Sequence, residues 1–193
     1  MEHSYFEDKT FGNNDFEIHP ISKGEYENCR FINCDISNFD LSEFKFTECE
    51  FIYCNLSLSK LVKTVFNEVK FKDCKMLGLH FDDCDNFGLS LGFDNCILSH
   101  SIFYGKKIKK TIFKNSQLQE VDFTGCDLTE SMFDNCDLAL ATFHNTIIEI
   151  ADFRTSFNFS IDPEQNRVKK AKFSINGIAG LLDKYSLEID YTK

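Results

Sequence analysis

The sequence predicts an elongated solenoid in which the chain turns a corner once every five residues. Three observations support this prediction: a large apolar residue recurs at every fifth position, a small residue usually precedes it by two positions, and residues that tolerate tight turns follow it. A helix repeats its faces every 3.6 residues and a strand every 2 residues. Neither element therefore explains a period of five that is held over most of the chain.

The large apolar residues form two runs, and the second run is two residues out of frame with the first. The first run is Phe6, Phe11, Phe16, Ile21, Tyr26, Phe31, Ile36, Leu41, Phe46, Phe51, Leu56, Leu61, Phe66, Phe71, Met76 and Phe81. The second run is Phe93, Leu98, Phe103, Ile108, Phe113, Leu118, Phe123, Leu128, Phe133, Leu138, Phe143, Ile148 and Phe153. We expect these residues, and the small residues two positions before them, to point inward.

The order of the large residues indicates how many pentapeptides make one coil. From Phe93 onward, phenylalanine alternates strictly with leucine or isoleucine. If four pentapeptides form a coil, each coil holds two rings and two smaller aliphatic side chains. A constant volume per layer is what a close-packed interior requires.

The repeated unit is a small residue, Asp or Asn, Leu or Phe, a polar residue and a turn residue. This unit resembles the pentapeptide-repeat family over about residues 4–155. The resemblance implies an all-β fold: a right-handed, quadrilateral (four-sided) parallel β-helix with four pentapeptides in each 20-residue coil. We therefore expect residues 1–155 to form the β-helix, with a break near residues 84–92.

The break shifts the frame by two residues and contains Gly88 and Gly92. A bulge or a short loop between two half-columns is the simplest cause. Two interpretations stay open: a tolerated insertion at an edge of the solenoid, or a kink or contact loop that displays Phe87.

The expected C-terminal segment, residues 156–193, begins with an irregular link from Ser156 to Lys172. Ser174 is expected to cap a short helix, and Leu187, Ile189 and Tyr191 alternate with polar residues as in a strand. An open end of a β-helix needs a cap, and excess apolar surface on the cap would form a two-fold dimer. The expected dimer interface is Ile175, Ile178, Leu181, Leu182, Tyr185, Leu187 and Ile189.

The charge balance favours a basic partner. Lys and Arg total 21 against 31 Asp and Glu, a formal net charge of −10, whereas a nucleic-acid binder normally carries excess positive charge. We therefore expect no direct binding to nucleic acid. The alternative is that the acidity only keeps the rod soluble.

Residues 20 apart should stack on one face, which places Asp8, Glu48 and Glu68 in one column with Asn28, beside Glu7 and Glu27. Other acidic residues gather at the break and in the second run. The expected partner-binding acidic surface is Glu27, Glu48, Glu68, Asp82, Asp83, Asp85, Asp122, Asp127, Glu130, Asp134 and Asp137.

One basic cluster interrupts this surface. Lys106 occupies an inward position, so we expect a bulged coil or a side chain that escapes to solvent. One coil later, Asp127 should lie over Lys107, and Glu130 over Lys110. The cluster is either a ladder of ion pairs or a site for a phosphate or another anion.

The cysteines fit the repeat better than they fit disulfides or a metal site. Eight of the nine cysteines stand two residues before a large residue, where a thiol is a small apolar filler. The sequence has no CxxC, HExxH or glycine-rich phosphate loop, and a regular column has no deep pocket. We therefore expect no catalytic residue, no cofactor, no metal and no enzymatic activity.

The N-terminal residues contain no apolar signal region, and no apolar run of 18 residues occurs in the chain. These features predict a cytoplasmic protein that does not enter a membrane.

The C-terminal residues 161–174 (Ile-Asp-Pro-Glu-Gln-Asn-Arg-Val-Lys-Lys-Ala-Lys-Phe-Ser), 180–185 and 187–189 resemble the ends of bacterial quinolone-resistance (Qnr-like) pentapeptide proteins. The resemblance implies an acidic, rod-shaped homodimer, joined through its C-terminal caps, that is similar to duplex DNA. Such a protein binds type II topoisomerases, DNA gyrase or topoisomerase IV, and protects them from fluoroquinolones. This sequence departs from several such members because no long loop interrupts either run. The alternative is a non-catalytic interaction scaffold with another protein as its partner.

Overall fold

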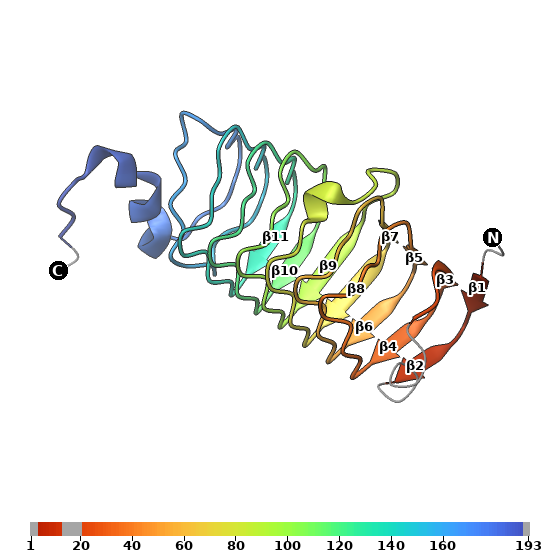
Figure 1. The fold of residues 1–193 in the computed structure, drawn as a ribbon. Coiled ribbons are helices and arrows are strands. Elements are labelled where there is room, and N and C mark those ends of the chain that lie inside the picture. Colours follow the sequence, from red (N-terminus) through yellow and green to blue (C-terminus); the bar gives the residue numbers. More distant parts are fainter. Residues whose placement is uncertain (1–3, 13–20, 191–193) are drawn as a thin grey trace.

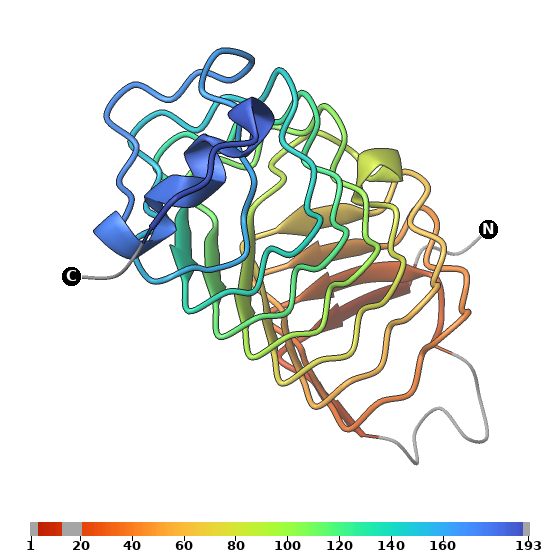
Figure 2. The same cartoon turned by 90° about the vertical axis from the view of Figure 1, so that its left-hand side faces the viewer.

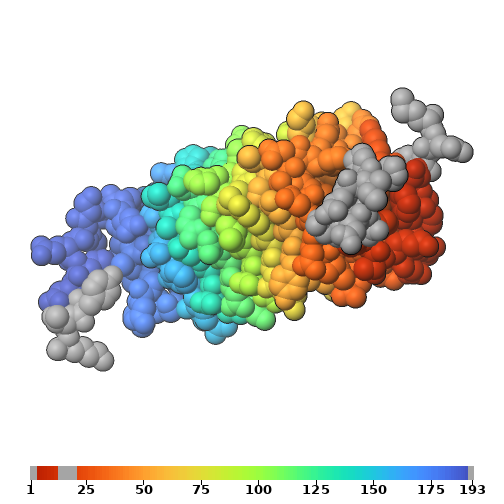
Figure 3. All heavy atoms as spheres, turned by 60° about the horizontal axis from the view of Figure 1, so that its bottom comes forward, coloured from red at the N-terminus to blue at the C-terminus, as the bar shows by residue number. Residues whose placement is uncertain are grey.

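The computed structural model describes residues 4–12 and 21–190 of the protein (Figure 1). The chain winds into a column of stacked coils, with its N-terminal coils at one end and the helical segment at the other (Figures 1 and 3). The strands and 3-10 helices are β1 (Ser4–Glu7), β2 (Thr10–Gly12), β3 (Gly24–Glu27), β4 (Arg30–Ile32), β5 (Lys45–Thr47), β6 (Glu50–Ile52), β7 (Val65–Asn67), β8 (Val69–Lys72), η1 (Phe81–Asp83), β9 (Leu91–Asp94), β10 (Ile112–Lys114), β11 (Met132–Asp134), η2 (Ile175–Leu181) and η3 (Asp183–Tyr185).

The column has four sides, as Figure 2 shows in a view turned by 90°. Two sides carry parallel sheets, with strand orders β1-β3-β5-β7 and β2-β4-β6-β8-β9-β10-β11. The other two sides are joined by isolated parallel bridges, such as Asp35 with Asn55 and Ile102 with Asp122. The fold is therefore the four-sided parallel β-helix that the resemblance of the repeated unit implies.

The register follows the repeat from coil to coil. Phe31 pairs with Phe51, and Phe93 with Phe113, so partners lie 20 residues apart on both sides of the break. Between β8 and β9, Phe71 pairs with Phe93, which is 22 residues later. The predicted shift of two residues is thus absorbed in one coil while the seven-stranded sheet stays continuous.

The core consists of stacked rings that meet at right angles within a layer. Phe93, Phe113 and Phe133 stack with centroid distances of 5.1 and 4.8 Å. The ring of Phe123 meets that of Phe113 edge to face, with a centroid distance of 5.8 Å and an interplanar angle of 78°. Both arrangements are favourable for aromatic pairs, so the interior is filled by a regular lattice of rings.

The small inward side chains satisfy backbone carbonyls of the coil before them. Ser59 Oγ donates to the Ile36 carbonyl at 2.6 Å, and Thr64 Oγ1 donates to the Leu41 carbonyl at 2.8 Å. All nine cysteines are buried and free, at inward positions of the column. Burial raises the pKa of the Cys49 and Cys136 thiols to about 12, so neither forms a reactive thiolate near neutral pH.

At the break, the loop of residues 84–90, named here the break loop, replaces the strand that would follow β7. The four-stranded sheet ends at this point. A new phenylalanine stack begins on a neighbouring side with Phe81, whose ring centroid lies 4.4 Å from that of Phe103. The amide of Ser90 returns the chain to the column by donating to the Phe66 carbonyl at 3.0 Å.

The position of Lys106 corrects one sequence-based expectation. Its side chain stays inside the column, and the residue is only 5% exposed. Its Nζ donates to the Cys84 carbonyl at 2.7 Å and to Asn86 Oδ1 at 2.8 Å. The break loop supplies these two acceptors, which is why an ammonium can occupy an inward position.

The repeat continues further than expected. We predicted an irregular link from Ser156 to Lys172, but the parallel bridges Ile147–Arg167 and Asp152–Lys172 add another coil. Phe173 stacks on Phe153 at 5.3 Å. The buried side chains of Phe159 and Ile161 fill the interior where the repeat is irregular.

The C-terminal cap consists of the two 3-10 helices η2 and η3. Ser174 caps η2 as expected, because its Oγ accepts from the Gly177 amide at 3.2 Å. Gly180 lies so close to the last coil that a Cβ atom would be 2.1 Å from the Phe159 carbonyl oxygen. The glycines that weaken an α-helix thus allow this cap to dock.

The predicted last strand does not form over residues 187–190. Its third member, Tyr191, lies outside the described residues, as does Phe16 of the first run. Within the described ranges, no helix has the length and apolar character needed to cross a membrane.

Candidate partner-binding surfaces

One corner of the N-terminal coils carries a row of carboxylates. Asp8, Asn28, Glu48 and Glu68 occupy this corner in successive coils, and all four have left-handed backbone, with φ between 50° and 55°. This conformation places their side chains at the turn, where they are exposed. Asn28 Nδ2 donates to Asp8 Oδ1 at 2.6 Å, whereas Glu48 and Glu68 form no ion pair or side-chain hydrogen bond with the residues that the structure describes.

A second pair of acidic residues widens this corner. Glu7 and Glu27 are register partners in β1 and β3. The Tyr5 hydroxyl donates to Glu27 at 2.6 Å, and this hydrogen bond raises the pKa of Tyr5 to about 12. We call Glu7, Asp8, Glu27, Glu48 and Glu68 the N-terminal acidic corner. The structure thus brings together three of the predicted site residues with two neighbours.

The predicted acidic residues at the break are near an exposed ring in sequence, and one of them contacts its backbone. Asp82 Oδ1 lies 3.3 Å from His80 Nδ1, and the side chain of Asp83 is exposed. Asp85 Oδ1 accepts from the Phe87 amide at 2.8 Å, which fixes the start of the break loop. Phe87 itself is 84% exposed. A loop held from inside by Lys106 therefore presents an aromatic side chain beside carboxylates.

The acidic residues predicted in the second run are mostly engaged in the turns of the column. Asp122, Asp127 and Asp137 each accept from the backbone amide two residues later, at 2.8, 3.1 and 3.2 Å. Asp134 accepts from the Thr155 hydroxyl at 2.9 Å. An aspartate that accepts from its own turn stabilises that turn.

The basic cluster forms part of the expected ladder. Asp127 lies over Lys107 in a parallel bridge and Glu130 pairs with Lys110 at 3.8 Å, both as predicted, but the Asp127 carboxylate pairs with Lys109 at 3.1 Å. Burial raises the pKa of Asp127, but hydrogen bonds from Thr129 and Lys109 outweigh it and hold the pKa below its usual range. The second run therefore offers fewer free carboxylates than its sequence suggests.

Opposite charges alternate on other columns as well. Glu25 pairs with Lys45 at 2.5 Å, and Arg30 with Glu50 at 3.3 Å. Exposed pairs of this kind contribute little to stability, but they neutralise the surface locally. Glu48 and Glu68 of the N-terminal acidic corner are among the exposed carboxylates that form no ion pair with a described residue.

The predicted dimer residues divide into packed and exposed groups. Leu181 packs against the core and Leu182 is half-buried. Ile175 is 80% exposed, and the remaining exposed members are Ile178, Tyr185, Leu187 and Ile189. An apolar surface of this kind at the end of a column is typical of a protein interface.

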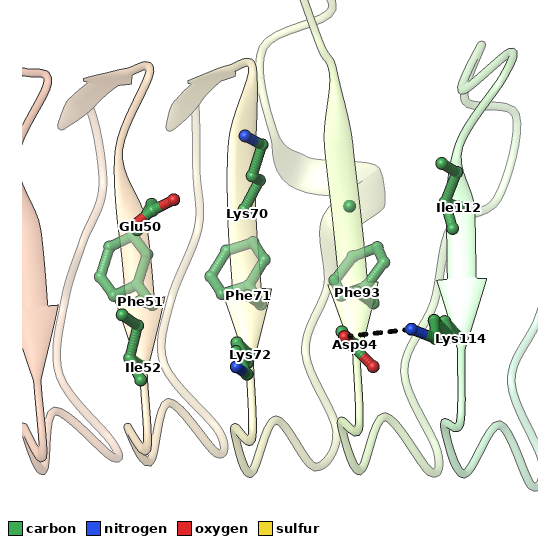
Figure 4. Close-up of a pocket in the computed structure, with 11 residues that line it drawn as sticks. Glu50, Phe51, Ile52, Lys70, Phe71, Lys72, Phe93, Asp94, Ile112 and Lys114 are labelled. Atoms are coloured by element: carbon green, nitrogen blue, oxygen red, sulfur yellow. Dashed lines mark ion pairs between the residues drawn. The ribbon is translucent and has the colours of Figure 1, made fainter.

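A shallow hollow of about 310 Å³ lies on the outer face of the seven-stranded sheet, across β6, β8, β9 and β10 (Figure 4). Gly92 lies at its centre, with the side chains of Lys70 and Ile112 on either side. This feature was not predicted from the sequence, although Gly92, directly before the inward Phe93, indicates an outward position without a side chain.

Within the described ranges, no group of three or more His, Cys, Asp or Glu residues could hold a metal ion. The described histidines, His80, His100 and His144, are exposed, and His100 Nδ1 lies 3.3 Å from Glu120 Oε2.

Comparisons with known proteins agree with this architecture. The family model described as a pentapeptide repeat region matches residues 25–92 and 89–153. A trypsin-treated form of QnrB1, a plasmid-mediated fluoroquinolone resistance protein, is 17% identical with a TM-score of 0.50, covering 98% of this chain and 100% of that chain. HetL, a pentapeptide repeat protein involved in heterocyst differentiation regulation from the cyanobacterium Nostoc, is 12% identical with a TM-score of 0.65, covering 90% of this chain and 85% of that chain. A search of curated proteins finds no match. At these identities the structural matches show the fold.

Proposed function

The chain belongs to the pentapeptide-repeat family, and from this premise we propose that it is a mimic of duplex DNA that binds a type II topoisomerase, DNA gyrase or topoisomerase IV. The observation that carries the proposal is the N-terminal acidic corner, whose Glu48 and Glu68 carboxylates lack ion-pair partners among the described residues. The protein acts without catalysis, and it works in the cytoplasm, where topoisomerases act on DNA.

The spacing of the corner supports the mimicry. Stacked coils are about 4.8 Å apart, and the phosphates of one DNA strand follow each other at about 3.4 Å along the axis. A straight row of carboxylates on a rigid column therefore presents negative charge at a pitch similar to that of a DNA strand. A basic groove that binds phosphates would attract such a row at long range.

Fluoroquinolone protection is the finer part of the proposal. It is supported by the resemblance of the C-terminal residues to Qnr-like proteins and by the fold shared with QnrB1. By occupying the DNA-binding surface of the topoisomerase, the protein lowers the number of enzyme–DNA complexes that the drug can trap. A homodimer joined through the caps would present two acidic corners.

A supercoiling assay with purified gyrase, with and without ciprofloxacin, tests the proposal. We expect inhibition of supercoiling at high protein concentration and relief of drug poisoning at lower concentration. The double variant Glu48→Lys with Glu68→Lys should lose both effects. Its matched control, Glu130→Lys with Asp134→Lys, makes the same change in net charge at carboxylates that already have partners, and should retain most of both. Equal activity of the two double variants would refute the role of the corner.

An interaction scaffold with a different protein partner is the second candidate, and the exposed Phe87 favours it. A single aromatic anchor beside carboxylates suits a partner pocket with a basic rim. If the activities of gyrase and topoisomerase IV are both unchanged at every protein concentration, the topoisomerase proposal fails and the scaffold remains.

A further inference from the structure

We propose that the hollow over Gly92 is a second binding site, which takes an acidic protein segment anchored by one large apolar side chain. This inference goes beyond the proposed function, because the site attracts the opposite charge, although Glu68 of the N-terminal acidic corner borders the Gly92 region.

The first argument is that nothing in the fold requires a glycine at position 92. In this column of the sheet, β8 presents Lys70, β10 presents Ile112 and β11 presents Met132 at the equivalent outward position. Gly92 has no left-handed backbone, and the nearest heavy atom to an added Cβ would be Lys70 Cγ at 4.0 Å. A glycine inside a strand weakens the strand and often marks a place where a ligand approaches closely.

The residues that line the hollow are largely apolar on the side that faces it. Ile52 and Ile112 line the hollow together with the side chains of Lys70 and Lys72 (Figure 4). Gly92 contributes only backbone to the lining. Apolar side chains and lysine stems make a surface that favours burial of an apolar group. The hollow has room for one large apolar side chain.

The edge of the hollow carries two lysines, Lys70 and Lys72, whose charge is not paired within the described residues. Lys70 and Lys72 form no ion pair with any residue that the structure describes. Lys114 pairs with Asp94 at 3.8 Å, and Lys110, which borders the Gly92 region on its other side, pairs with Glu130 at 3.8 Å. Two free ammonium groups beside an apolar hollow stand out on a chain with a net charge of −10. They complement an occupant that carries carboxylates.

The openness of the hollow identifies the occupant as a protein segment. A small-molecule site usually encloses most of its ligand, whereas this hollow is open along the face of the sheet (Figure 4). A protein can place one anchoring side chain in such a hollow and add contacts around it. An aromatic or large aliphatic residue between acidic residues satisfies both the walls and the rim.

Fluorescence anisotropy with a labelled peptide, Glu-Asp-Phe-Glu-Asp, tests the proposal. Binding to the full chain should weaken at least about tenfold in Gly92→Leu, which places an apolar side chain in the hollow. The control Thr10→Leu adds the same side chain to the same column on β2, away from the hollow, and should bind normally. The double variant Lys70→Glu with Lys72→Glu should also lose binding, while Lys60→Glu with Lys75→Glu should not.

Thermal unfolding of each variant separates loss of binding from loss of fold, and the lysine pair keeps the test decisive if Gly92→Leu unfolds. Unchanged binding by a folded Gly92→Leu would overturn the proposal. So would equal binding of Lys-Lys-Phe-Lys-Lys, or of a peptide with glycine in place of phenylalanine. Displacement of the labelled peptide by benzoate, at the concentration at which unlabelled peptide displaces it, would also overturn the proposal. That result would identify the occupant as a small aromatic carboxylate and not a protein segment.

Discussion

Lys106 is the side chain whose environment departs furthest from the repeat. The equivalent inward positions of the next two coils hold Cys126 and Thr146, both buried. A buried ammonium is tolerated only when acceptors surround it. The Cys84 carbonyl and the Asn86 side chain provide these acceptors, so one residue joins the interior of the column to the break loop.

Replacement of Lys106 by methionine should therefore destabilise the protein. The substitution keeps most of the apolar stem but leaves the Cys84 carbonyl without its donor, at a cost of about 2 kcal/mol. Urea unfolding followed by circular dichroism measures this change. Lys107→Met, at the exposed neighbouring position, serves as the control and should change the free energy of unfolding by less than about 0.5 kcal/mol. Equal midpoints for the two variants would show that the two hydrogen bonds do not stabilise the fold.

At this scale, the sequence predicts which side chains point inward but not where charged side chains reach. The period of five correctly places rings such as Phe93 and Phe123 in the core. It cannot predict that Asp127 pairs with Lys109, because a long flexible side chain can choose between neighbouring columns. Spacing alone also does not show that Asp122 and Asp137 accept from their own turns, which leaves them less free to bind a partner.

Among the elements, the break and the last coil show two ways in which the repeat is interrupted. Val168 and Phe173 follow Ile148 and Phe153 by 20 residues, so the last coil is in frame with the second run. Asn158 and Pro163 occupy the two intervening large positions and conceal this continuity. Residues 187–190 show the opposite error, because alternation predicts a strand only where a neighbouring strand is available for hydrogen bonding.

The docking of the cap should depend on pH. Lys184 Nζ lies 2.8 Å from Asp162 Oδ1 and 2.5 Å from Glu164 Oε2, and these contacts hold the pKa of both carboxyls below the usual range. A lowered folded-state pKa stabilises the docked cap above the unfolded-state pKa, at about pH 4, and this stabilisation is lost as the pH falls through the folded-state values.

Amide NMR signals of Ala179 and Leu182 in the cap should therefore shift as the pH falls below about 4, before the signals of the column change. In Lys184→Met, this separate transition should disappear. Persistence of the transition in the variant would assign it to other carboxyls.

For the whole molecule, the two ends of the column have different surfaces. The N-terminal coils carry the acidic corner, and the C-terminal end carries exposed apolar residues, among which Ile175 is the most exposed. We predict a homodimer through the cap. Light scattering at micromolar concentration should show twice the chain mass of 22.4 kDa, and Ile175→Asp should yield the monomer because a buried carboxylate is costly. Tyr104→Asp, at an exposed apolar residue outside the cap, should remain dimeric. A wild-type monomer under these conditions would contradict the prediction.

Competition for gyrase between this protein and linear duplex DNA tests DNA mimicry most directly. Labelled protein bound to gyrase should be displaced by increasing DNA, and its affinity should fall steeply between low and physiological salt, because screening weakens attraction between opposite charges. Simultaneous binding of DNA and protein, or an affinity that does not change with salt, would contradict the account.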